Sequence, residues 1–297
     1  MSKAELFEAL GSRPMLCDGG LGTQLIEAGM TTGECGVLWN VEKPEAIRAI
    51  HRRYADAGCE LLTTNSFQGS RTALEMHGLS ERAAELNKAA AALAAEAAGE
   101  RALVLADVGP FGGFLEPLGE TTEAELRDIF IEQYGALKEG GADAALVETM
   151  SDPAEVGVAI RAAREVDGDW PILATLPYQK VGEGYGTMMG TGAAEATALA
   201  LEHGATVVGA NCGTELDLGD YVRLAEVLVR QAGDTPVMVQ PNAGSPQREG
   251  DSIVYPASPR DMAAIARELV AAGVTVIGGC CGTTPDHLRA MGEAIRA

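Results

Sequence analysis

Residues 274–285 read Val-Thr-Val-Ile-Gly-Gly-Cys-Cys-Gly-Thr-Thr-Pro. The apolar run at the start predicts a short buried strand, and Pro285 after Thr284 predicts the first turn of a helix with Thr284 as its N-cap. Two adjacent thiols, Cys280 and Cys281, therefore lie where a strand ends and a helix begins. A regular strand would point them to opposite faces, but the flanking glycines allow the backbone to leave strand geometry, so both sulfurs can face one point.

The same strand–helix unit occurs repeatedly before this point. The earlier predicted strands cover residues 15–18, 60–66, 103–107, 144–148, 171–176, 205–210 and 236–240, each followed by a predicted amphipathic helix. Eight such units predict an α/β fold in which a parallel sheet closes into a single (β/α)8 TIM-type barrel over residues 1–297. An open doubly wound sheet is the alternative, but the count of eight favours closure, and no Gly-x-Gly-x-x-Gly nucleotide fingerprint follows the first strand.

The composition excludes several classes of protein. The chain carries a formal net charge of −21, which argues against nucleic acid and anionic membranes as partners. No apolar run is long enough for a transmembrane helix, and acidic residues interrupt the N-terminus before it can form a signal peptide. We therefore expect a cytoplasmic protein whose six cysteines are free or metal-bound rather than paired.

Polar side chains gather at the predicted strand ends. In a (β/α)8 barrel the active site forms at the C-terminal ends of the strands. The residues at these ends are Asp18, Asn65, Ser66, Asp107, Glu148, Thr175, Asn211, Cys212, Asn242, Cys280 and Cys281. Nearly every strand thus ends in a group that can bind a ligand, and we expect the functional site at this end of the barrel.

Three interpretations of the vicinal cysteines are open. A disulfide between Cys280 and Cys281 is disfavoured, because neighbouring Cα atoms lie about 3.8 Å apart, below the usual range for a disulfide. Two inert core thiols are the second interpretation. A metal ion would need a third ligand, and Cys212 supplies one at the end of the sixth strand. Zinc held by three cysteines with an open fourth position is a catalytic arrangement, which can activate an incoming thiol for attack on a carbon electrophile.

Three runs of the sequence resemble a known family: residues 18–23 (Asp-Gly-Gly-Leu-Gly-Thr), residues 209–212 (Gly-Ala-Asn-Cys) and residues 278–285. Together they resemble the homocysteine S-methyltransferase family, zinc-dependent barrels that move a methyl group onto homocysteine to give methionine. The resemblance covers nearly the whole chain. Residues 241–244 (Pro-Asn-Ala-Gly) and 282–285 are most similar to the homocysteine-binding module of cobalamin-dependent methionine synthases. The other modules of those enzymes have no counterpart in this sequence.

The resemblance implies a ligand set and a substrate site. Zn²⁺ would be held by Cys212, Cys280 and Cys281, with the homocysteine sulfur as the fourth ligand. The implied contacts to the rest of the substrate are Glu148 and Asp18 for the ammonium, the N–H groups of Gly19 and Gly20 for the carboxylate, and Asn65, Ser66 and Asn242 as weaker candidates. Alternatively, Glu148 only forms a structural ion pair, and Asp18 only braces the glycine turn.

The methyl donor is the open part of this hypothesis. A thiolate can accept a methyl group from a sulfonium, a quaternary ammonium or a corrinoid cobalt, and small onium donors favour an aromatic cage. Aromatic residues make up only 4% of the chain, which favours a methylated corrinoid protein over a small onium compound such as betaine or S-methylmethionine. The glycine-rich residues 178–192 are either a mobile lid or a surface loop.

Two other classes of protein stay open. A metal-free barrel lyase or isomerase would use Asp18, Asp107 and Glu148 for acid–base chemistry. A zinc carrier would bind the metal at the same thiols without catalysing a reaction. No lysine lies at a predicted strand end, which counts against a Schiff-base aldolase.

Overall fold

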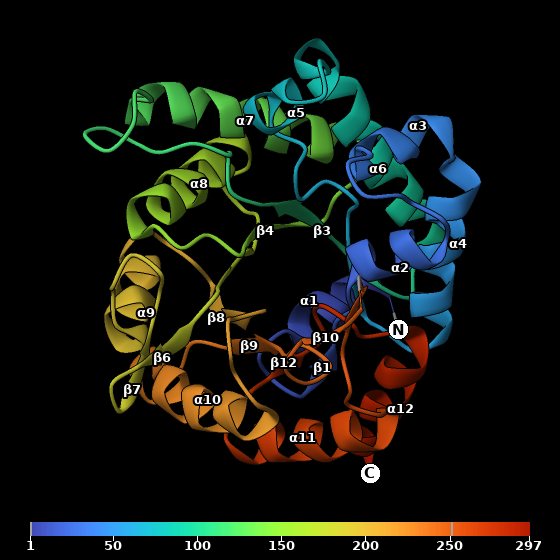
Figure 1. The fold of residues 1–297 in the computed structure, drawn as a ribbon, viewed down its shortest axis with the longest axis vertical. Coiled ribbons are helices and arrows are strands. Elements are labelled where there is room, and N and C mark those ends of the chain that lie inside the picture. Colours follow the sequence, from blue (N-terminus) through green and yellow to red (C-terminus); the bar gives the residue numbers. More distant parts are fainter. Residues whose placement is uncertain (1, 251) are drawn as a thin grey trace.

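The computed structural model describes residues 2–250 and 252–297. Eight parallel strands form one sheet in the order β1-β12-β9-β8-β5-β4-β3-β2. These strands are β1 (Met15–Leu16), β2 (Leu61–Thr63), β3 (Leu103–Val108), β4 (Ala144–Glu148), β5 (Ile172–Leu176), β8 (Val207–Asn211), β9 (Val237–Gln240) and β12 (Val276–Ile277). Figure 1 shows a ring of helices around them.

The sheet closes between its two terminal strands. Cys17, directly after β1, forms a parallel bridge with Leu61 of β2. The N–H of Asp18 donates to the carbonyl oxygen of Leu61 over 3.0 Å, and the N–H of Glu60 donates to that of Leu16 over 2.7 Å. Strands that are consecutive in the chain therefore lie side by side, and the last strand lies beside the first. The predicted (β/α)8 barrel is confirmed.

Local sequence signals set the starts of the outer helices. These helices are α4 (Pro44–Asp56), α6 (Ala83–Ala98), α7 (Glu123–Glu139), α8 (Pro153–Val166), α9 (Ala193–Glu202), α10 (Leu218–Ala232), α11 (Pro259–Ala271) and α12 (Pro285–Arg296). At the start of α8, the Asp152 carboxylate accepts the N–H of Ala154 over 2.9 Å. At the start of α12, Pro285 follows the N-cap residue Thr284, as its sequence predicts. No helix in the described part of the chain combines the length and hydrophobicity needed to cross a membrane.

Hydrophobic cores occupy both sides of the sheet. The larger core lies between the strands and the surrounding helices, and a smaller one fills the barrel interior. Helix α1 (Lys3–Ala9) packs the fully buried Leu6 against this interior core, whose members include Leu61 and Leu103, the first residues of their strands. The barrel is thus filled at its N-terminal end, and the space for a ligand lies at the C-terminal ends of the strands.

Short elements that the sequence analysis did not predict lie between strand ends and outer helices. They are α2 (Leu21–Glu27), η1 (Gly36–Leu38), α3 (Trp39–Glu42), α5 (Arg71–Glu75), η2 (Ser80–Arg82), and the hairpins β6 (Gln179–Val181)–β7 (Gly184–Gly186) and β10 (Gln247–Glu249)–β11 (Ser252–Val254). Helices this short are too brief to be stable by propensity alone. Contacts with the rest of the fold stabilise them, so the periodicity of the sequence does not reveal them.

Residues 178–192, for which the sequence predicts either a lid or a surface loop, contain the hairpin β6–β7. The buried carboxylate of Asp220 anchors this hairpin to α10: Lys180 Nζ lies 2.7 Å from Asp220 Oδ2, and the Tyr185 hydroxyl donates to Oδ1 over 3.1 Å. Arg223 Nη2 donates to the same Oδ1 over 2.7 Å. Burial alone would raise the pKa of Asp220, but these partners hold it below its usual range. The hairpin is therefore an anchored element, and its action as a lid stays a prediction.

His51 on α4 allows a prediction about the pH dependence of stability. Its side chain is fully buried, and neither ring nitrogen has a hydrogen-bond partner among the described residues. Burial lowers its pKa from 6.5 to about 4, so between these values the unfolded chain binds a proton that the folded chain does not. The free energy of unfolding therefore falls by about 3 kcal/mol as the pH falls from 6.5 toward 4. Above pH 6.5 the ring is neutral in both states, and this stability is fully present.

We expect His51→Leu to reduce this loss of stability in acid. Urea unfolding at neutral and mildly acidic pH measures it, because the drop between the two conditions should be smaller in the variant than in the native protein. Buried carboxyl groups with raised pKa values, such as Glu155, instead stabilise the folded protein as the pH falls. They are present in both proteins, so their effect cancels in the comparison. His77→Leu, at a half-buried position in the turn after α5, is the control. Equal drops in the native protein and His51→Leu would contradict the prediction.

Candidate metal centre and substrate cavity

Three thiols meet at the C-terminal end of the barrel. The Sγ atoms of Cys212, Cys280 and Cys281 all lie within 4.8 Å of one another, and those of Cys280 and Cys281 are 4.0 Å apart. A tetrahedral zinc ion with Zn–S bonds of about 2.3 Å separates its sulfurs by about 3.8 Å. The donor type and the spacing of these three atoms therefore fit zinc, and the structure brings together the thiols that the sequence singled out.

Cys212 reaches the cluster by leaving strand geometry directly after β8. Its φ angle is +51°, in the left-handed region that residues other than glycine rarely adopt, and Gly213 follows with φ +108°. The N–H of Cys212 donates to the carbonyl oxygen of Gln240 over 3.2 Å, and its own carbonyl accepts the hydroxyl of Tyr221. Hydrogen bonds on both sides thus hold an otherwise unfavourable backbone conformation.

The turn that carries Cys280 and Cys281 is also held by hydrogen bonds. The N–H of Cys280 donates to the carbonyl of Pro241 over 2.9 Å, and the N–H of Cys281 donates to Asn242 Oδ1 over 3.0 Å. Gly282 has φ +77°, and a Cβ atom there would lie 2.3 Å from the Cβ of Tyr255. This position therefore requires glycine both for its conformation and for space.

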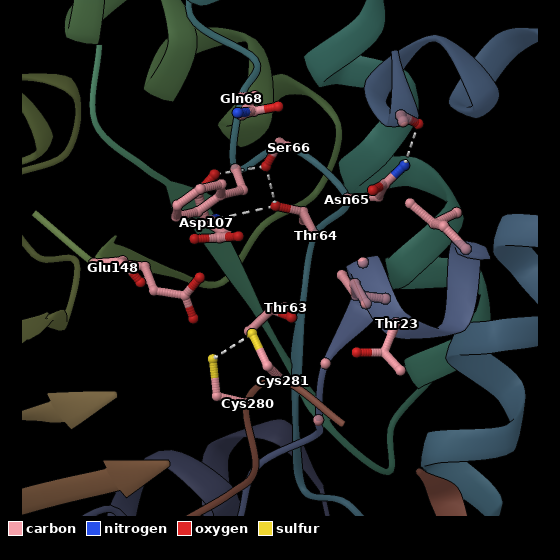
Figure 2. Close-up of a pocket in the computed structure, with 18 of the residues that line it drawn as sticks. Thr23, Thr63, Thr64, Asn65, Ser66, Gln68, Asp107, Glu148, Cys280 and Cys281 are labelled. Carbon is pink, nitrogen blue, oxygen red and sulfur yellow. Dashed lines mark hydrogen bonds between the residues drawn. The ribbon is translucent and has the colours of Figure 1, made fainter. Parts of the chain in front are cut away.

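A cavity of about 410 Å³ opens beside the thiols. Figure 2 shows Glu148, at the end of β4, pointing into the same space as Cys280 and Cys281. The polar and glycine lining includes Gly19, Gly20, Thr23, Asn65, Ser66, Gln68, Asp107, Glu148 and Gln240 together with the three cysteines. Among the described residues, no lysine, arginine or histidine lines this cavity.

Acidic groups dominate the electrostatics of the cavity. Burial, with smaller contributions from Asp18 and Cys281, raises the pKa of Glu148 to about 8. Burial also raises the pKa of Asp107 well above its usual range, and Glu148 adds to this effect. No cationic side chain of the described chain lines the cavity to offset these carboxyl groups. A cationic ligand group would satisfy this arrangement.

Asp18, Gly19 and Gly20 were predicted to contact the substrate directly, and the structure leaves only Gly19 free to do so. Asp18 is fully buried and accepts the N–H of Thr63 over 2.8 Å and its hydroxyl over 3.1 Å. It is not among the residues that line the cavity, and burial raises its pKa to about 7. The N–H of Gly20 donates to Thr283 Oγ1 over 3.0 Å, so it is already engaged. Gly19 lines the cavity, and its N–H has no partner among the described residues.

The three predicted amide and hydroxyl contacts divide into two groups. Asn65 and Ser66 line the cavity, where Asn65 Nδ2 donates to the carbonyl of Gly36 over 2.9 Å and Ser66 Oγ donates to that of Asp107 over 2.6 Å. Asn242 does not line it. Its Oδ1 accepts the N–H of Cys281 instead, which places Asn242 behind the thiols rather than beside a substrate.

Gln240 and Thr23 are among the lining residues that were not predicted from the sequence. Gln240 is the last residue of β9, and its buried Oε1 has no partner among the described residues. Its position at a strand end was the signal that could have identified it. Thr23 also lines the cavity and accepts the N–H of Gly282 at Oγ1 over 3.0 Å. No pattern in the sequence links these two distant positions.

Comparisons with known proteins give consistent results. A family model described as homocysteine S-methyltransferase matches residues 15–295. Methionine synthases of Mycobacterium leprae (strain TN) and Mycobacterium tuberculosis (strain ATCC 25618 / H37Rv) are each 31% identical to this chain over 309 aligned residues, which cover 98% of the chain and 25% of each relative. The chain thus spans about a quarter of the length of these curated relatives.

Solved structures support the fold. The metallated form of the homocysteine methyltransferase MmuM from Escherichia coli superimposes with a TM-score of 0.76 at 23% identity, covering 96% of both chains. Its oxidised form gives a TM-score of 0.77 and covers 98% of this chain and 99% of that one. At this level of identity the likeness concerns the barrel architecture alone.

Proposed function

This chain belongs to the homocysteine S-methyltransferase family, and from this premise we propose that it transfers a methyl group to the thiol of homocysteine, giving methionine. We take residues 1–297 as a single homocysteine-binding barrel domain. The observation that carries the proposal is the cavity itself, in which three convergent thiols face a group of carboxyls with no cationic side chain among the described lining residues. A substrate with a thiol at one end and an ammonium group nearby matches both features.

We assign Zn²⁺ to Cys212, Cys280 and Cys281 because their number, softness and spacing suit it. Zinc bound there would supply a Lewis acid that lowers the pKa of the incoming homocysteine thiol. The three cysteine thiolates keep the site electron-rich. Glu148 binds the substrate ammonium, and the Gly19 N–H donates to the carboxylate. Asn65 and Ser66 shape the cavity wall beside them, because their own donors are engaged by protein oxygens. Family membership favours this chemistry over a metal-free lyase or isomerase.

A methylated corrinoid protein is the donor that we propose first. The large apolar side chains that are exposed in the described chain all lie between the end of a barrel strand and the next outer helix. They are Ile26, Met76, Phe114, Leu118, Val181, Met188, Met189 and Ile253. Exposed apolar residues on the segments that follow the barrel strands favour contact with another protein, and the cavity lies at the same ends of the strands.

A small onium compound is the second candidate donor, and a different observation favours it. Glu34, Phe67 and Met30 line the same cavity as the thiols. A carboxylate and an aromatic ring can together bind a methylated cation such as betaine or S-methylmethionine. In this case the methyl group would be delivered from within the cavity, without a partner protein.

An assay for methionine distinguishes these donors. Zinc-loaded protein is incubated with homocysteine and, separately, with methylcobalamin, betaine or S-methylmethionine. Methionine from methylcobalamin supports the corrinoid donor, whereas methionine from an onium compound alone would replace that donor and leave the acceptor chemistry intact. No methionine with any of the three donors, from protein shown to contain zinc, would contradict the proposed reaction for those donors.

A further inference from the structure

The buried hydroxyl of Tyr221 lies between two of the loops that build the thiol cluster. Tyr221 is in the first turns of α10, and its side chain is fully buried. Its hydroxyl donates to the carbonyl oxygen of Cys212 and accepts the N–H of Asn242 over 3.4 Å. One side chain therefore ties the residue after β8 to the loop after β9.

Asn242 extends this connection to the other two thiols. Its Oδ1 accepts the N–H of Cys281 over 3.0 Å, and its Nδ2 donates to the carbonyl of Gly213 over 3.5 Å. The Tyr221 hydroxyl and the Asn242 amide thus link the segment of Cys212 to the segment of Cys281 through hydrogen bonds alone. Within the described chain, these bonds pass behind the cavity, because neither Tyr221 nor Asn242 is among its lining residues.

The conformation of Cys212 makes this link necessary. A non-glycine residue at φ +51° is strained and persists only where the surroundings hold it. The N–H of Cys212 is held by Gln240, and its carbonyl is held by Tyr221. Without the hydroxyl, the peptide after Cys212 loses its partner and can relax toward a commoner conformation, which would redirect Sγ.

Helix α10 gives Tyr221 a fixed position from which to act. The start of the helix is set by a capping box in which Asp217 and Asp220 each accept the backbone N–H of the other. Asp220 also carries the ion pairs with Lys180 and Arg223. The tyrosine is therefore attached to a rigid element, as a group that orients a metal ligand must be.

We propose that Tyr221 is a positioning residue for the metal centre, whose hydroxyl holds Cys212 in the left-handed conformation that directs its sulfur toward Cys280 and Cys281. The inference rests on the proposed function, in that the three thiols hold a metal. It assigns Tyr221 no contact with the substrate. A purely structural role would affect the stability of the whole barrel, whereas this role affects the thiol geometry selectively.

Tyr221→Phe tests the proposal, because it removes the hydroxyl and keeps the ring. Tyr134→Phe is the matched control: Tyr134 is equally buried, donates its hydroxyl to the carbonyl of Leu146 over 3.4 Å, and does not line the cavity. Zinc affinity is measured by competition with a chromogenic chelator, and urea unfolding of the zinc-free proteins is measured alongside. We expect Tyr221→Phe to lower zinc affinity about 10–100-fold, and Tyr134→Phe to leave it unchanged.

A second readout does not depend on zinc. In the zinc-free protein, alkylation by iodoacetamide followed by mass spectrometry gives the reactivity of Cys212 relative to Cys280. Tyr221→Phe should raise this ratio, because Cys212 leaves the cluster more often. Unchanged zinc affinity and an unchanged ratio, or equal losses of affinity in both tyrosine variants, would overturn the inference. A native protein that binds no zinc would instead overturn the proposed function, and the inference would fall with it.

Discussion

Cys212→Ala is expected to abolish stoichiometric zinc binding and to lower methionine formation by at least about 10³-fold, since zinc supplies several kcal/mol of activation to the thiol. Cys212 comes from a different segment of the chain than Cys280 and Cys281, and its sulfur lies within 4.8 Å of both. Without it, two thiols would have to hold the ion at a site built for three. Metal analysis of the purified variant and the methionine assay measure the two effects.

Cys35→Ala is the control for this experiment. Cys35 is a half-buried free cysteine that does not line the cavity, so the same chemical change there should leave zinc content and activity as in the native protein. A Cys212→Ala protein that still binds one zinc per chain and makes methionine at the native rate would contradict the assignment of the ligand set.

Glu148→Gln is expected to lower kcat/KM for homocysteine by about 10²–10⁴-fold while zinc content stays the same. Removing one partner of a buried ion pair costs about 3–5 kcal/mol, because the remaining charge is left without compensation. Glutamine keeps the shape of Glu148 but carries no charge to offset the ammonium group. Asp107 cannot easily replace it, because its raised pKa favours the neutral acid. The loss should appear mainly in KM, since the ammonium is bound equally in the ground and transition states.

A substrate analogue makes this second test specific. 4-Mercaptobutanoate carries the thiol and the carboxylate of homocysteine but lacks the ammonium group. The native protein should strongly prefer homocysteine over it, and Glu148→Gln should lose most of that preference. Glu155→Gln is the control, because Glu155 is another buried carboxyl, bonded to the N–H of Phe111 over 2.8 Å and outside the cavity. Retained preference in Glu148→Gln would show that another group binds the ammonium.

The fold could be read from the sequence because it depends on patterns that repeat. Eight apolar runs with intervening helices leave few arrangements open, and the strand order together with the bridge between Cys17 and Leu61 confirms the closed barrel. The strand β12 is shorter than the apolar run that predicts it, since the described strand covers only Val276–Ile277. The hairpin β6–β7 was not predicted, because Asp220, whose ion pair with Lys180 anchors it, lies on a distant helix.

The sequence predicts which residues lie at the strand ends. It does not predict which atoms each of them contacts. Cys212, Cys280 and Glu148 share one face because parallel strands end at the same side of a barrel. Asp18 and Asn242 also lie at strand ends, but the structure turns their oxygens to Thr63 and Cys281. Which way a terminal side chain turns depends on neighbouring backbone groups, whose positions follow only from the packed structure.

The most direct test of the central claim is zinc K-edge X-ray absorption of the zinc-loaded protein, recorded with and without homocysteine. Three cysteines with an exchangeable fourth position predict three sulfur neighbours at about 2.3 Å and one lighter atom, changing to four sulfurs when homocysteine is added. Fewer than three sulfurs in the free protein, or a zinc environment that homocysteine leaves unchanged, would contradict it.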